Sequence, residues 1–119
     1  MNRRTDIIFH ALNERRLRVI QSKDVTRSIR GLGIPDIDCV ACFVHADADR
    51  KPNTPFGWIV FGQNPDEATV AHEASHAIRV LFAGLGVRND NETFAYHLDF
   101  LVGRIHKFLK AGKMQHKKH

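Results

Sequence analysis

Residues 64–86 read NPDEATVAHEASHAIRVLFAGLG and contain signals for both ends of a long helix. Asn64 suits the N-cap and Pro65 suits the first helical position. Gly84 or Gly86 can end the helix in the left-handed conformation. Between these ends, apolar residues recur at helical spacing. We therefore predict a long helix that packs one face on the rest of the fold.

The centre of this helix holds HEASH at residues 72–76, an H-E-x-x-H motif. Positions i and i+4 of a helix share one face about one turn apart, so both imidazoles can bind one ion. At 100° per residue, the histidines point away from the apolar stripe between Val70 and Leu85. Eight His and four Glu in 119 residues would give this motif by chance about 0.02 times per chain. The pattern therefore indicates a metal site.

A catalytic zinc site has three protein ligands and leaves its fourth position for water. His72 and His76 supply two ligands. Glu92 is the predicted third, because it opens the next helix 16 residues after His76. Three other side chains of that helix remain alternatives for the third position: His97, Asp99 and His106. Glu73 lies beside the histidines and is the predicted general base.

A second long helix is predicted from residue 91 to 110, after the capping cluster Asn89-Asp90-Asn91. Its apolar stripe lies opposite a polar line that includes Glu92 and Tyr96. Two strands are predicted upstream, at 37–45 and 57–62, joined by a loop rich in proline and asparagine.

The N-terminal part gives weaker patterns. Residues 4–16 are predicted to form a short amphipathic helix, because the isoleucines and Leu12 fall on one side. Residues 17–20 alternate in polarity and predict a short strand. Ser22 can cap a second short helix.

These elements predict one α+β domain, with a small antiparallel or mixed sheet packed on the H-E-x-x-H helix and a long C-terminal helix. Its expected parts within residues 1–119 are an N-terminal helical part (1–35), strands (36–63), a metal-binding helix pair (64–110) and a basic tail (111–119).

Residues 71–77 and 91–96, AHEASHA and NETFAY, resemble the zincin metallopeptidases whose third ligand is Glu. They are especially similar to small ImmA/IrrE-like and phage- or prophage-encoded peptidases, so the resemblance implies a minimal zincin-like domain. The likeness covers residues 57–105, about two-fifths of the chain, and its H-E-x-x-H part is the specific one. The chain departs from many such zincins at Tyr96, where they have Asp, and in lacking a large second lobe.

The resemblance implies a zinc-dependent metallopeptidase that acts on peptides or proteins. Zn²⁺ would polarise the peptide carbonyl, and Glu73 would carry a proton from water to the leaving amine. By helical position, Tyr96 is the nearest candidate for a second oxyanion donor, and Asp99 can orient a histidine ligand. Zincins of this type align an extended substrate on a strand before the active helix, which here is 57–61.

Charge is distributed unevenly along the chain. Residues 1–30 carry 8 basic and 3 acidic side chains, residues 104–119 carry 6 and none, and residues 31–103 carry 4 and 10. Basic ends can bind nucleic acid or another polyanion, although solvated helix ends explain the same charges. The competing function is a zinc-stabilised, non-catalytic module that binds a partner protein or nucleic acid through these ends. Glu73 favours hydrolysis, because a structural zinc site needs no general base.

Cys39 and Cys42 form one C-x-x-C without a second pair. We interpret them as reduced cysteines of a strand, with a redox or metal role as the alternative. No apolar run approaches the roughly 18 residues of a membrane helix, and the N-terminus lacks a signal peptide's apolar stretch. We therefore expect no membrane segment and a cytoplasmic protein.

Overall fold

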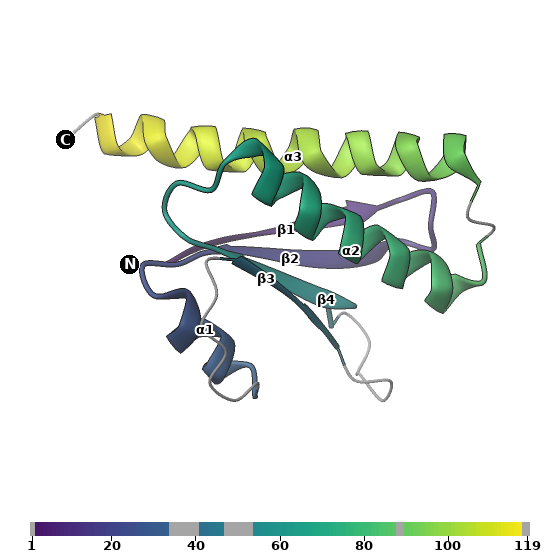
Figure 1. The fold of residues 1–119 in the computed structure, drawn as a ribbon, viewed down its shortest axis with the longest axis horizontal. Coiled ribbons are helices and arrows are strands. Elements are labelled where there is room, and N and C mark those ends of the chain that lie inside the picture. The colour runs from purple at the N-terminus through teal and green to yellow at the C-terminus, as the bar shows by residue number, and fades with distance from the viewer. Residues whose placement is uncertain (1, 34–40, 47–53, 88–89, 118–119) are drawn as a thin grey trace.

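The structure, a computed structural model, describes residues 2–33, 41–46, 54–87 and 90–117, with side chains up to residue 113. Its elements are β1 (Arg3–Phe9), β2 (Arg15–Gln21), α1 (Val25–Gly31), β3 (Ala41–His45), β4 (Gly57–Phe61), α2 (Glu67–Leu85) and α3 (Asn91–Lys117). The α+β class is confirmed, with a mixed sheet and a long last helix (Figure 1). Across the described stretches, no helix is both long and apolar enough to cross a membrane.

Four strands form one sheet in the order β1-β2-β4-β3. β1 and β2 are antiparallel, β4 runs parallel to β2, and β3 runs antiparallel to β4. β1 and β3 are therefore the edge strands, and β4 has a neighbour on each side. The two strands predicted before the long helix are confirmed as β3 and β4, although residues 37–40 lie outside the described residues.

β1 and β2 form a hairpin, so the helix predicted over residues 4–16 is wrong. Ile7 and Phe9 are each 2% exposed and alternate with more exposed neighbours, which is the period of a strand. The turn between the strands contains Asn13 and Glu14 with φ of 56° and 54°. A right-handed helix does not pass through two such residues.

α1 is the one helix among the described residues of the predicted N-terminal helical part, 1–35. Its N-cap is Asp24, whose Oδ1 accepts the Arg27 N–H at 3.1 Å. Ser22, the predicted cap, accepts the Asp24 N–H with its hydroxyl at 3.1 Å and so supports the cap from the preceding turn.

The two faces of the sheet are covered by different helices (Figure 1). On one face α2 and α3 cover the larger core, whose buried strand residues are Ile7, Phe9, Leu17, Val19, Ile59 and Phe61. On the other face, Val44 and Val60 pack against Val25 and Ile29 of α1. The larger core therefore determines how α2, which carries the H-E-x-x-H motif, sits on the sheet.

One apolar stripe fixes α2 on the sheet. Its members are 0–3% exposed: Val70, Ala74, Ala77, Ile78 and Leu81. The N-cap is Asp66 rather than Asn64, and Asp66 Oδ1 accepts the Thr69 N–H at 2.7 Å. That hydrogen bond holds the pKa of Asp66 below its ordinary value. Of the two glycines predicted to end the helix, Gly84 and Gly86, it is Gly86 that does so, with φ of 67°.

Arg3 joins the first strand to the last helix. Its guanidinium donates to Gln21 Oε1 at 2.9 Å and to the Phe108 carbonyl at 3.2 Å, and it lies 4.4 Å from the centroid of the Phe108 ring. A Cβ at Gly112 would overlap this guanidinium, so glycine permits the close contact between β1 and α3. The helix continues through residue 117, so most of the predicted basic tail (111–119) is helical.

Gly57 allows β3 and β4 to pair closely. A Cβ at this position would lie 2.6 Å from the Phe43 ring and 2.9 Å from the Val44 carbonyl oxygen. We expect Gly57→Ala to lower the free energy of unfolding by about 1–3 kcal/mol, the usual cost of overpacking. Urea denaturation measures this change.

Gly84→Ala is the matched control, because an added Cβ on this residue of α2 meets no atom within 4 Å. Alanine there should raise the free energy of unfolding by about 0.5–1 kcal/mol, since it is the better helix former. Equal effects of the two substitutions would contradict the close approach at Gly57.

Candidate metal centre

His72 and His76 face each other across one turn of α2. Their Nε2 atoms are 3.1 Å apart, their ring planes meet at 87°, and both residues are exposed. At this distance one Nε2 donates a hydrogen bond to the other. The pair points away from the sheet because the apolar stripe of α2 occupies the opposite side.

The pair has nearly the spacing of two ligands on one ion. Zinc–nitrogen bonds of about 2.0–2.1 Å place two nitrogens roughly 3.3–3.4 Å apart in a tetrahedral site. The rings need to separate by only a few tenths of an ångström, and each must carry its proton on Nδ1 so that both Nε2 lone pairs are free. Two imidazoles in this arrangement fit zinc or another transition metal that prefers nitrogen.

Glu73 lies beside the pair at the border between solvent and core. The residue is 8% exposed, and its Oε1 is 4.0 Å from His72 Nε2. Within the described part of the chain, no group donates a hydrogen bond to this carboxylate. The carboxylate oxygens that lack a partner are still reached by solvent, so Glu73 can act on a molecule bound beside the histidines. The position of Glu73 therefore favours a chemical role over a packing role.

α3 packs on the other flank of α2. Phe94 of α3 contacts Arg79 and Phe82 of α2, with the Arg79 guanidinium 5.7 Å and the Phe82 ring 6.3 Å from its ring centroid. At 100° per residue, Phe82 lies 180° around the helix from Glu73. The first turns of α3 are thus beside the C-terminal half of α2, away from the flank that carries Glu73.

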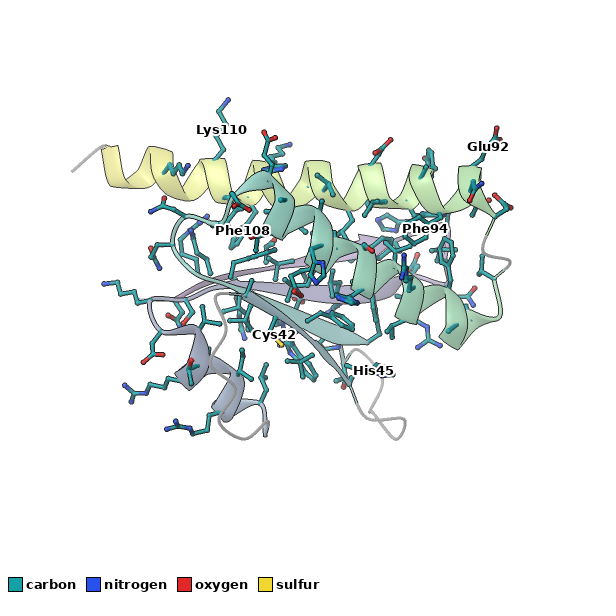
Figure 2. All side chains as sticks on the ribbon, in the orientation of Figure 1. Cys42, His45, Glu92, Phe94, Phe108 and Lys110 are labelled. Carbon is teal, nitrogen blue, oxygen red and sulfur yellow. The ribbon has the colours of Figure 1, made fainter. Side chains whose placement is uncertain are left out.

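The structure does not bring Glu92, the predicted third ligand, to the histidine pair. Glu92 is exposed, and its side chain points away from α2 (Figure 2). Phe94 is level with Phe82, which lies about 9 Å beyond His76 along α2 at 1.5 Å per residue. Glu92 comes two residues before Phe94, so it is level with a point roughly 9–12 Å beyond His76. Tyr96, the predicted oxyanion donor, is also on α3 and is 69% exposed, with its ring 5.1 Å from that of His97. Both roles stay predictions that require α3 to shift against α2.

The alternative third ligands are also separate from the pair. His97 is 9% exposed, with its ring centroid 6.5 Å from that of Phe9 and 5.5 Å from that of Phe82. His106 borders a cavity beside α3, and Asp99 is exposed. Among the residues that the structure describes, no three His, Cys, Asp or Glu side chains form a group that could hold a metal ion.

The C-x-x-C motif is only partly described. Cys42 is half-buried on β3, and Cys39 lies outside the described residues. The interpretation as reduced strand cysteines and the redox or metal alternative both stay predictions.

The strand expected to align a substrate needs a correction. β4, residues 57–61, pairs with β2 on one side and with β3 on the other, so it offers no free edge. The prediction that a substrate adds to this strand is wrong, because sequence order does not reveal the order of strands in a sheet. The edge strand that packs beside α2 is β3.

A cavity of about 90 Å³ lies further along the seam between α2 and β3. Its lining residues are Arg15, His45, Phe56, Val80, Leu81, Gly84 and Leu85. Val80 and Gly84 lie within about 20° of Glu73 around α2, roughly 10 and 16 Å further along its axis. His45 projects at the end of β3 (Figure 2). The flank that carries Glu73 therefore leads along the edge strand to this cavity.

Comparison of the chain with protein families, with curated proteins and with solved structures found no match. The likeness to zincins therefore rests on the sequence motifs quoted above.

His76→Ala should weaken zinc binding at least about a hundredfold, because it removes one of two imidazoles that approach a single point. Isothermal titration with zinc measures the affinity, and elemental analysis after dialysis measures the stoichiometry. His45→Ala removes another exposed histidine and should leave zinc binding unchanged. Full zinc retention in His76→Ala would exclude this site.

Glu92→Gln tests the third ligand separately. If Glu92 binds the ion, the zinc affinity of this variant falls at least about tenfold while the fold is kept. Unchanged affinity would remove Glu92 from the ligand set and leave the two histidines as the part of the site on α2.

Burial lowers the pKa of His97 below the ordinary histidine value of about 6.5. The unfolded chain therefore binds a proton more readily than the folded protein. Neutral His97 therefore contributes fully to the stability of the fold above the ordinary histidine pKa. This contribution is lost as pH falls through that value toward the lower pKa of the folded protein. We expect the free energy of unfolding to decrease between about pH 8 and pH 5. Urea denaturation across this range measures it.

His97→Phe should lose this part of the pH dependence, because the ring packing is kept while the titrating group is removed. His45→Gln removes an exposed histidine and should retain the dependence of the parent protein. Identical pH profiles for His97→Phe and the parent would show that His97 does not contribute.

Proposed function

We propose that the protein is a zinc-dependent metallopeptidase whose reaction centre is built on α2. The observation that supports this most is the pair of Nε2 atoms of His72 and His76, 3.1 Å apart, with the Glu73 carboxylate 4.0 Å from one of them. Two imidazoles and a nearly buried carboxylate on one helix supply two metal ligands and a base side by side.

His72 and His76 would hold the ion, and Glu92 remains the predicted third ligand. Zinc supplies a Lewis acid that polarises a peptide carbonyl and lowers the pKa of water. Glu73 accepts a proton from the attacking water and delivers it to the leaving amine. Its carboxylate lies 4.0 Å from His72 Nε2, close to where an ion held by the two histidines would bind water.

An extended polypeptide substrate could add to the free edge of β3, beside α2. A strand advances about 3.3–3.4 Å per residue. The cavity that begins roughly 10–16 Å beyond Glu73 would then accept a side chain about three to five residues from the cleaved bond. Its apolar wall and the basic side chains of Arg15 and His45 suit a chain that is apolar or acidic at that position.

The competing function, a zinc-stabilised binding module, gains less support. A structural zinc ion joins separate elements through four protein ligands. Here both imidazoles come from one helix and are exposed, so an ion held by them alone would not join α2 to another element. Cytoplasmic location stays a prediction from the sequence.

Glu73→Gln should keep zinc and lower the rate of peptide hydrolysis by about 10²–10⁴, because an amide keeps the shape but cannot accept a proton. The free energy of unfolding should be nearly unchanged, because glutamine fills the same space as glutamate. Digestion of a peptide library by the zinc-loaded protein, read by mass spectrometry, measures the hydrolysis.

Glu67→Gln makes the same chemical change in the exposed first turn of α2 and serves as the control. It should hydrolyse peptides at the parent rate. If Glu73→Gln cleaves the same bonds at an unchanged rate, Glu73 is not the base; if the parent protein cleaves nothing while binding zinc, the binding-module function gains.

A further inference from the structure

A second cavity, of about 240 Å³, lies between α3 and the segment that connects β4 to α2. Its lining residues are Gln63, Pro65, His106, Leu109, Lys110 and Lys113. None of these residues is His72, His76 or Glu73, and none lines the 90 Å³ cavity between α2 and β3. Neither the metal chemistry nor the proposed peptidase function uses it.

The polar side chains of this cavity are suited to an anion. Two are lysines, one is a histidine and one is an amide, so each can donate a hydrogen bond and none is a carboxylate. The carboxylate nearest along the chain is Asp66, which accepts the Thr69 N–H as the N-cap of α2. The surrounding part of α3, residues 100–113, carries four basic side chains and no acidic one.

The wall of the cavity is held in place by hydrogen bonds that cross the fold. Gln21 of β2 donates through Nε2 to the Gln63 carbonyl at 2.9 Å. The other amide atom of Gln21 accepts from Arg3, which also donates to the Phe108 carbonyl of α3. These bonds tie the segment at Gln63 to both the sheet and α3. A wall that is fixed before binding lowers the entropy lost when a ligand arrives.

We propose that this cavity binds a phosphate group, carried by a nucleotide or by the backbone of a nucleic acid. Two lysines and a histidine around one hollow match a multiply charged oxyanion better than a single carboxylate. Lys110 extends from α3 into solvent (Figure 2), and its flexible stem allows the ammonium to close over a bound anion. The volume holds a phosphate ester and excludes a folded protein surface.

The phosphate would bind in this one cavity. The rival explanation is that the basic side chains of α3 attract any polyanion without a defined site. Two double variants separate them. Lys110→Gln with Lys113→Gln removes two charges from the cavity wall. Arg104→Gln with Lys107→Gln removes two charges from exposed positions of the same helix that do not line the cavity. Both double variants lose the same net charge, so diffuse attraction predicts equal effects.

The experiment measures the affinity of each protein for adenosine monophosphate, by NMR titration, and for a fluorescent single-stranded oligonucleotide, by anisotropy, at one low salt concentration. We expect the cavity variant to bind at least about tenfold more weakly, because charge-assisted hydrogen bonds are lost, and the control variant to change by no more than about twofold. Circular dichroism and thermal unfolding confirm that both variants are folded.

Gln63→Leu adds a test that leaves the charge unchanged. It should weaken binding severalfold if the amide contacts the phosphate. Binding of the mononucleotide identifies a nucleotide site, and binding of the oligonucleotide alone identifies the nucleic-acid backbone as the source of the phosphate. Equal losses in the two double variants, or no binding of either probe to the parent protein, would overturn the proposal.

Discussion

The burial of one stripe of α2 is the constraint on which the arrangement of the candidate site depends. Residues such as Ala74 and Ile78 are fully buried against the sheet, so α2 has one rotational setting. A turn of 100°, one residue, would place a histidine or Glu73 in the core and expose apolar side chains. The orientation of His72, His76 and Glu73 is thus a result of hydrophobic packing, and a metal ion is not needed to create it.

The sequence predicted the elements whose periodicity is long and regular. α2 and α3 were found because their apolar stripes repeat over several turns. Capping residues located the ends of α2 approximately: its C-terminal end is at Gly86, one of the two predicted glycines, and its N-cap is Asp66, two residues after the predicted Asn64. The N-terminal hairpin was missed because Ile7, Ile8 and Leu12 fit a helical face as well as a strand. These residues form a strand because β1 pairs with β2, and this pairing cannot be inferred from the residues of β1 alone.

The third ligand shows the limit of helical-wheel reasoning. A wheel gives the angle of a residue around its helix and says nothing about its level along a neighbouring helix. α2 continues to Leu85 and the connection to Asn91 is short, so Glu92 remains near the far end of α2 from the histidines. The two histidines and Glu73 lie on one helix and required no such knowledge. Their relative geometry could therefore be predicted from spacing alone.

α3 has two chemically different halves. Its first half contains Glu92 and Asp99, and its second half contains lysines and arginine. Acidic residues near the start and basic residues near the end both complement the dipole of a helix. Part of the positive charge around the second cavity therefore stabilises α3 itself. Basic residues at this end of the helix do not by themselves indicate a binding site, and the cavity beside them is the additional feature that does.

The contact between Arg3 and Phe108 spans 105 residues of the chain. β1 cannot complete its packing until the second half of α3 exists, although β1 is synthesised first. The hairpin therefore has one face uncovered until α3 packs on it, and contacts between residues so far apart in the sequence slow folding. We therefore expect a chain that stops before residue 108 to leave part of the core surface of β1 uncovered, and uncovered apolar surface promotes aggregation.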